Sequence, residues 1–124
     1  MNLGYCLAQL AHNAQVIRQL ASDVPDEEVR WKPALDSWSI LEVINHLYDE
    51  EREDFRAHLK HILDRSTAPW PRIDPQGWVA ARGYNQRDLG PSIEGFLLER
   101  EASLTWLRTL SDPDWHIPYQ APFG

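Results

Sequence analysis

The chain has 124 residues, of which 43% are hydrophobic and 25% charged, which predicts one globular domain over residues 1–124 and excludes an intrinsically disordered chain. Its 12 basic and 19 acidic residues give a net charge of −7, which repels phosphate backbones and anionic lipid headgroups and argues against a nucleic-acid partner. One cysteine rules out an internal disulfide, and the absence of a leader-like N-terminus or a long apolar run argues against a membrane span and indicates a cytoplasmic protein.

The first predicted helix covers residues 3–21, where apolar residues recur at helical spacing. His12 lies opposite this apolar stripe and is expected to be exposed. Cys6 borders the stripe without a basic residue nearby in the sequence to lower its pKa, which argues against a nucleophilic role. The predicted buried residues are Leu3, Leu7, Leu10, Ala14 and Ile17.

The second predicted helix covers residues 39–64. Ser39 and Glu42 form the S-x-x-E capping box directly before an apolar periodic run. The preceding connection contains two prolines and one short helical turn at residues 26–29. The expected core stripe of the second helix consists of Ile40, Val43, Ile44, Leu47, Phe55, Leu59 and Ile62.

A long crossover is predicted between the second and third helices, because residues 65–91 contain four prolines and three glycines. It is expected to pack Trp70 and Trp78 against the molecule, with a brief helix at residues 78–84. The third helix should begin near Pro91 or Ser92 and end before residues 111–114. Its predicted apolar face consists of Ile93, Phe96, Leu97, Leu104 and Leu107.

Three amphipathic helices leave a bundle one helix short, since helix bundles usually close with four. The sequence shows no strand pattern, so an all-α fold is expected. A closing helix would come from another chain, from the crossover, or from sequence after Gly124. The domain is therefore expected to be incomplete at its C-terminus.

The most informative polar stripe contains His46, Glu50 and Glu53. At 100° per residue, His46 and Glu50 lie about 40° apart and Glu53 within about 60° of both. Imidazole and carboxylate groups at the edge of a helix could hold a divalent metal ion. A histidine with a glutamate four residues later also arises often as a simple solvated pair, and from the spacing alone this second interpretation is favoured.

The acidic run at residues 49–54 reads first as a solvated helix face. Glu51 and Asp54, however, project close to the apolar stripe of their helix, and Arg100 lies within the apolar stripe of the third helix. Because an unpaired buried charge costs several kcal/mol, an ion pair between Arg100 and one of these acids is expected.

The remaining histidines carry weaker signals. His58 and His61 have a spacing that can chelate a metal, but packed or exposed roles are favoured. His116 follows a tryptophan in the C-terminal tail, where a loop role is favoured over lining a pocket. No residue is assigned as a catalytic acid, base or nucleophile.

Two segments of the chain carry a characteristic order of features. Residues 25–51, PDEEVRWKPALDSWSILEVINHLYDEE, contain a basic-proline connection, a tryptophan, the capped helix start and a histidine before acids. Residues 84–110, YNQRDLGPSIEGFLLEREASLTWLRTL, contain the third predicted helix with its arginine. Together these segments resemble the DinB/YfiT-like superfamily of metalloenzymes, and the resemblance covers most of the chain.

This resemblance implies an up-down-down-up four-helix bundle, of which this chain holds three main helices. It also implies a divalent metal held by three histidines, one from the second helix and two from an H-x-x-x-H pair in the fourth. His46 matches the first ligand, whereas the other two have no matching positions. The histidines that do not fit this pattern are His12, His58, His61 and His116.

The resemblance also implies a metal-dependent enzyme, with zinc or nickel as the expected ion. Characterised relatives include transferases and an isomerase that use low-molecular-weight thiols, so a thiol S-transferase acting on small electrophiles is the expected activity. Glu50 and Glu53 would line the pocket without coordinating the metal. The alternative is a non-catalytic interaction module without metal. A homodimer is expected under both interpretations, because an uncovered apolar face is rarely left exposed.

Overall fold

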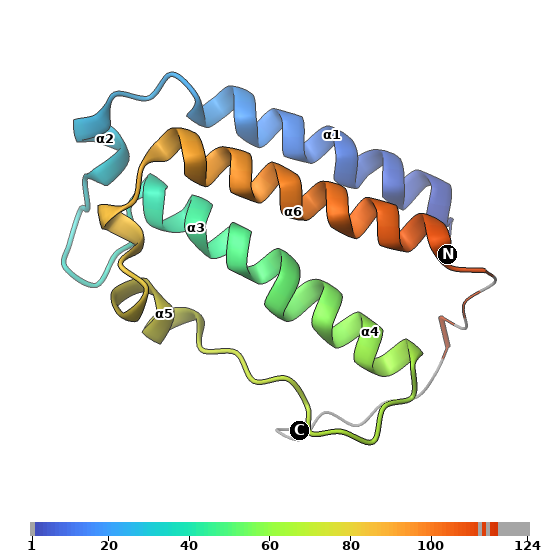
Figure 1. The fold of residues 1–124 in the computed structure, drawn as a ribbon. Coiled ribbons are helices and arrows are strands. Elements are labelled where there is room, and N and C mark those ends of the chain that lie inside the picture. Colours follow the sequence, from blue (N-terminus) through green and yellow to red (C-terminus); the bar gives the residue numbers. More distant parts are fainter. Residues whose placement is uncertain (1, 112, 114, 117–124) are drawn as a thin grey trace.

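The computed structural model describes residues 2–111, 113, 115 and 116, and these residues form an all-helical bundle without strands. Three long helices build it: α1 (Leu3–Ala21), a continuous helix made of α3 (Ile40–Glu50), η1 (Glu51–Arg56) and α4 (Ala57–Leu63), and α6 (Leu89–Thr109). α1 runs antiparallel to the other two, which are parallel to each other (Figure 1). The expected all-α bundle is confirmed. The prediction that a closing helix comes from sequence after Gly124 lies outside the described residues.

Local sequence signals set most of the helix ends. The Asn2 side chain accepts a hydrogen bond from the Tyr5 N–H at 3.0 Å and caps α1. Ser39 and Glu42 form the predicted capping box, in which each side chain accepts a bond from the backbone N–H of the other. α6 begins at Leu89, slightly earlier than predicted, because Pro91 is tolerated in a first turn that needs no N–H donor.

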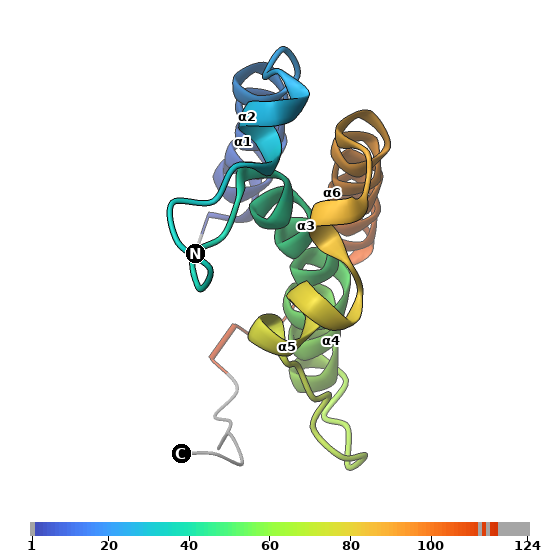
Figure 2. The ribbon, with the colours of Figure 1, turned by 90° about the vertical axis from the view of Figure 1, so that its left-hand side faces the viewer.

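The core lies where the three long helices meet. Ala21, Ile44 and Ile93 are each at most 4% exposed, and Ile17, Leu89 and Leu97 pack around them. Figure 2 looks along the long helices, which lie around this core. Further along α6, the core also contains Phe96, Leu104 and Leu107. Burying each such side chain contributes roughly 1.5–3 kcal/mol. The predicted apolar face of α6 is thus the one that the structure buries.

A close approach of α3 and α6 depends on a glycine. A Cβ atom at Gly95 would lie 2.0 Å from the ring of Tyr48, so any larger residue would clash with that ring. The two helices can therefore pack tightly enough to bury the polar side chains of α3 that lie between them.

The predicted core stripe of the second long helix is wrong at its N-terminal end. Ile40 and Val43 are 42% and 40% exposed, whereas Leu41 is fully buried. The helix is rotated because its interior side carries the polar residues Asn45 and Asp49, whose hydrogen bonds are satisfied by side chains from distant segments.

The second long helix also contains a stretch of different geometry. Residues Glu51–Arg56 form a π-helix, the helix type defined by hydrogen bonds from an N–H to the carbonyl five residues earlier rather than four. The prediction of an uninterrupted helix is right about the length but misses this wide segment. Glu51, its first residue, is buried at 5% exposure.

The crossover runs back along the second long helix, as expected. It carries α5 (Pro75–Ala81) and a 3₁₀ turn, η2 (Tyr84–Gln86), so its helical part begins earlier than predicted. The Trp70 ring stacks on His58 with centroids 4.1 Å apart, and the Arg82 guanidinium lies 3.9 Å from the centre of the Trp78 ring. Upstream of α3, the predicted short turn is α2 (Asp26–Arg30).

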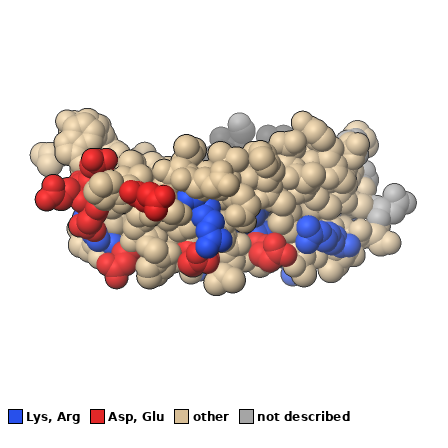
Figure 3. All heavy atoms as spheres, turned by 90° about the horizontal axis from the view of Figure 1, so that it is seen from above, with Lys and Arg blue, Asp and Glu red and all other residues tan. Residues whose placement is uncertain are grey.

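Charged residues are unevenly spread over the surface. In the view onto α1, the acidic side chains gather at the end of the molecule where α2 lies, and uncharged residues cover most of the remainder (Figure 3). The first turn of α2 supplies Asp26, Glu27 and Glu28. Within the described part of the chain, no helix combines the length and hydropathy that crossing a bilayer would require.

Candidate functional site

The start of α3 is held in place by bonds to two other segments. The Ser39 hydroxyl bonds to the Asn85 side chain at 2.6 Å, which ties the helix start to η2. The Lys32 ammonium lies 3.2 Å from the buried carboxylate of Glu42. These contacts fix the first turn of α3, and therefore the position of the histidine that follows it one turn later.

His46 lies half-buried against a tryptophan. Its side chain is 22% exposed, and its ring centroid is 4.8 Å from the Trp38 ring. Burial lowers the pKa of His46 below its ordinary value, although the nearby charges of Asp54 and Asp49 act in the opposite direction. The ring is therefore neutral at pH 7, which is the form that binds metal ions.

Glu50 is the nearest carboxylate to this imidazole. Its Oε2 lies 3.5 Å from the His46 Nε2. Burial, a hydrogen bond to Asp54 and the negative charges of Asp54 and Glu51 raise the pKa of Glu50 to about 7. The carboxyl group of Glu50 therefore gains or loses its proton close to neutral pH.

Asp54 continues the same side of the helix towards the crossover. Its carboxylate lies 2.6 Å from the His58 Nδ1, and the other ring nitrogen of His58 lies 2.6 Å from the Pro71 carbonyl oxygen. His58 and Trp70 also stack, so the crossover is held against α4 at this point. His58 is therefore packed and fully engaged.

Glu53 is placed differently from Glu50. Its carboxylate accepts hydrogen bonds from the Arg82 guanidinium, one of them at 3.1 Å, and lies 3.5 Å from Arg52. The structure therefore brings Glu50 to His46 but pairs Glu53 with the crossover. That Glu53 lines a pocket remains a prediction.

Of the two acids expected to meet Arg100, the structure selects Glu51. The Arg100 Nε donates to Glu51 Oε1 at 2.8 Å, and its Nη1 donates to the Leu10 carbonyl oxygen at 2.8 Å. The two side chains are 13% and 6% exposed. Asp54 is bonded to His58 instead, so this buried pair links η1, α6 and α1.

The other histidines lie apart from His46. His12 is exposed on α1, as expected, and His116 lies exposed in a turn after α6. His61 is buried on α4, where its ring meets the edge of the Trp70 ring. Cys6 is partly buried on α1.

A second polar cluster, which the sequence analysis missed, surrounds Asp49. This carboxylate is 1% exposed and accepts hydrogen bonds from Arg52 and Arg82 at 2.7 Å each, and from the Tyr84 hydroxyl. Burial, together with the hydrogen bond and charge of Asp49, raises the pKa of Tyr84. The signal available was the run of Arg82, Tyr84 and Arg87 inside an otherwise Gly- and Pro-rich crossover.

Asn45 belongs to the same interior. Its Nδ2 donates to the Leu41 carbonyl and to the Ser92 hydroxyl at 3.0 Å, and its Oδ1 accepts from Arg87 at 2.8 Å. Because its amide has partners on two other segments, this cluster fixes how α3 is rotated behind His46.

The described residues fit a metal ion only in part. Two ligands of one tetrahedral zinc ion, each about 2.0–2.1 Å from it, lie roughly 3.3 Å apart. The 3.5 Å between His46 Nε2 and Glu50 Oε2 is close to that value. Enzymatic zinc sites use three protein ligands, however, and the described part of the chain contains no group of three or more His, Cys, Asp or Glu side chains suited to a metal.

The order of these features agrees with a comparison of the chain against protein-family models. The DinB superfamily model matches residues 9–124. The chain belongs to the DinB superfamily. No curated protein and no solved structure matches it significantly. The parallel second and third long helices of this bundle agree with the up-down-down order that the resemblance implies, and family membership leaves the activity to be argued from the site.

Proposed function

We propose that this DinB-superfamily protein binds a divalent metal ion, zinc or nickel, through His46 and uses it to transfer a low-molecular-weight thiol to small electrophiles. The observation that carries the proposal is the neutral, half-buried imidazole of His46 with Glu50 3.5 Å from it. Imidazole suits both metals, and partial burial limits competition from water.

The side chains around His46 have separate tasks in this proposal. Trp38 holds the imidazole ring in one orientation through their contact. Glu50 holds a proton near neutral pH and can give it up when a cation binds nearby. A bound divalent ion would supply the positive charge that keeps a thiol in its reactive thiolate form.

Further donors are needed to complete the coordination of the metal. Residues outside the described part of the chain, or a second copy of it, would supply them. The exposed position of Ile40 and Val43 supports this part of the proposal, since Val43 adjoins His46 on α3 and the two exposed aliphatic side chains could be covered by another helix.

The same exposed residues favour a second candidate function, a helical interaction module without metal. Ile40 and Val43 are three residues apart, and Val43 and His46 are again three apart, so Val43 adjoins both of the others on the surface of α3. A neutral histidine beside exposed aliphatic groups would suit a protein interface as well as a metal ligand.

Metal content separates these two functions. We expect about one zinc or nickel ion per chain by elemental analysis after incubation with metal and removal of excess by gel filtration. His46→Ala should lose it, whereas His12→Ala, which alters an exposed histidine on α1, should keep it. Absence of metal from both the original protein and the His12→Ala variant would refute the metal-dependent function and leave the interaction module.

A further inference from the structure

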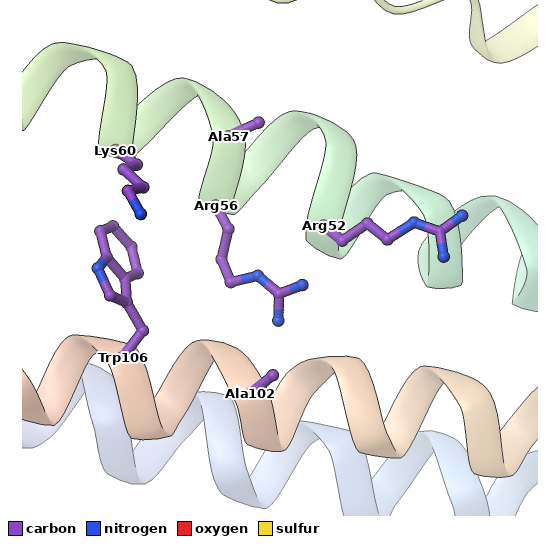
Figure 4. Close-up of a pocket in the computed structure, with 6 residues that line it drawn as sticks. All are labelled: Arg52, Arg56, Ala57, Lys60, Ala102 and Trp106. Carbon is purple, nitrogen blue, oxygen red and sulfur yellow. The ribbon is translucent and has the colours of Figure 1, made fainter.

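A hollow of about 350 Å³ lies between the second long helix and α6 (Figure 4). We call it the α4–α6 hollow. Ala102 points into it from α6, and its side chain ends at Cβ, where a longer one would fill the space (Figure 4). Its lining residues are Arg52, Arg56, Ala57, Lys60, Ala102 and Trp106.

Three cations occupy one wall of the α4–α6 hollow. Arg52, Arg56 and Lys60 come from the second long helix, and all three side chains line the same hollow. Such a row of positive charge is unusual in a chain with a net charge of −7. It can attract an anion that the rest of the surface repels.

The row is neutralised at one end but not at the other. Arg52 pairs with Asp49 at 2.7 Å, and Arg56 pairs with the Glu99 carboxylate while its Nη1 donates to the Glu99 carbonyl at 2.9 Å. Lys60 is exposed and forms no ion pair with another described residue. Positive charge therefore remains at the Lys60 end of the hollow.

An aromatic ring faces this remaining charge. Figure 4 shows the Trp106 ring of α6 beside the Lys60 side chain, across the gap from the second long helix. The ring is partly buried and offers a flat apolar surface next to a cation. This combination suits a ligand with an apolar ring and a negative group attached to it.

We propose that the α4–α6 hollow binds a small organic anion in which an aromatic ring carries a phosphate or carboxylate group. The ligand ring stacks on Trp106 between Ala57 and Ala102. The anionic group accepts hydrogen bonds from Lys60 and from the N–H groups of Arg56 that Glu99 leaves available. The volume lies within the range of small-molecule pockets, which is roughly 300–1,000 Å³.

This site is separate from that of His46. Asp54, which adjoins Glu50, is bonded to His58 next to the crossover, whereas Arg56 is bonded to Glu99 of α6. The two sites therefore open on different sides of the second long helix, and binding in the hollow does not depend on a metal ion.

Calorimetric titration with defined probes tests the proposal. Phenyl phosphate and benzoate carry the two anionic groups, whereas inorganic phosphate lacks the ring and benzyl alcohol lacks the charge. We expect saturable binding of at least one aromatic anion, about tenfold tighter than of either incomplete probe. The Trp106 indole N–H resonance should shift with the same saturation curve.

Two variants locate the site. Lys60→Gln should weaken binding by about tenfold through loss of the charge, and Ala102→Leu by at least as much through filling the hollow. Both positions are exposed, so the helical fold should persist, as checked by circular dichroism. The control Arg108→Gln changes an exposed arginine of α6 outside the hollow and should bind within about twofold of the original protein.

Three results would overturn the proposal: no saturable binding of either aromatic anion, unchanged binding by Ala102→Leu, or equal affinity for benzyl alcohol. All titrations are done after treatment with a chelator. A result that refutes the proposed metal-dependent function would therefore not change the result of the titrations of the hollow.

Discussion

At the scale of single residues, the carboxyl group of Glu50 is the titrating group whose environment is most informative. Its pKa is raised to about 7 from an ordinary value of 4.5 by burial and by the neighbouring acids Asp54 and Glu51. The folded protein therefore binds more protons than the unfolded chain between these two pH values. Folding stability consequently falls as the pH rises through this window.

Glu50→Gln should remove this loss of stability in metal-free protein. Between pH 6.5 and 8 the free energy of unfolding of the original protein should fall relative to that of the variant, by less than about 1 kcal/mol because the side chain is a third exposed. Below pH 6.5, His46 acts in the opposite direction, since its pKa is lowered in the folded state. Urea denaturation at several pH values measures the difference.

The control for this measurement is Glu94→Gln, which changes an exposed acid paired with Arg18. The stability of this variant should follow that of the original protein across the same pH range. If Glu50→Gln and Glu94→Gln gave the same pH dependence, Glu50 would not be the group that titrates.

At the scale of helices, the buried pair of Arg100 and Glu51 joins η1 to α6. Arg100→Leu should destabilise the protein by about 3–5 kcal/mol, because it leaves the Glu51 carboxylate buried without its partner. Adding Glu51→Gln should restore part of that loss, with a coupling energy of about 1–3 kcal/mol. The rescue is partial because the Leu10 carbonyl also loses a donor in both variants.

Asp54→Asn provides the matched control, since Asp54 is bonded to His58 rather than to Arg100. Combining it with Arg100→Leu should give additive changes in the free energy of unfolding. Additivity in the Glu51 series as well would contradict a stabilising role for the buried pair.

The helices themselves could be predicted from local patterns. The apolar spacing of α1 and α6 and the Ser39–Glu42 capping box each lie within one helix, so the sequence contains the whole signal. The capping box even marks the first residue of α3 correctly, because its two bonds join residues only three apart.

The rotation of α3 could not be predicted in this way. Asp49 belongs to the acidic run that reads first as a solvated helix face, and the polar Asn45 is not part of the predicted core stripe. Asn45 and Asp49 are nevertheless 0% and 1% exposed. Their burial depends on Arg87, 42 residues from Asn45, and on Arg82, 33 residues from Asp49. Partners this distant leave no local pattern in the sequence from which the burial could be predicted. The choice of Glu51 as the partner of Arg100 could not be predicted for the same reason.

The candidate site could be predicted in part, because some of its contacts lie within one helix. His46 and Glu50 are four residues apart on one helix, so their proximity follows from helix geometry alone. The pairing of Glu53 with Arg82 requires the crossover to fold back, which spacing on one helix does not reveal.

At the scale of the whole molecule, the exposed aliphatic residues beside His46 predict self-association. Ile40 and Val43 lie on the side of α3 away from the core, and pairing two copies through this side would bury them. We expect a dimer in sedimentation velocity at tens of micromolar protein. Val43→Lys should shift the protein towards monomer, because it places a charge in the interface.

Leu20→Lys serves as the control, since Leu20 is 75% exposed but lies on α1. It should leave the sedimentation of the dimer unchanged. A monomer for the original protein at this concentration would contradict the prediction, and equal effects of the two substitutions would place the interface elsewhere.

The π-helical segment Glu51–Arg56 has a consequence for the second long helix as a whole. Its wide turn takes up more residues than an α-helical turn, so it shifts the phase of everything that follows by about one residue, or roughly 100°. In a regular α-helix, His58 would turn away from Pro71 and Arg56 away from Glu99. The π-helical segment thus changes the direction in which the later side chains of this helix point. One uninterrupted helix can therefore carry His46 on one side and line the α4–α6 hollow on another.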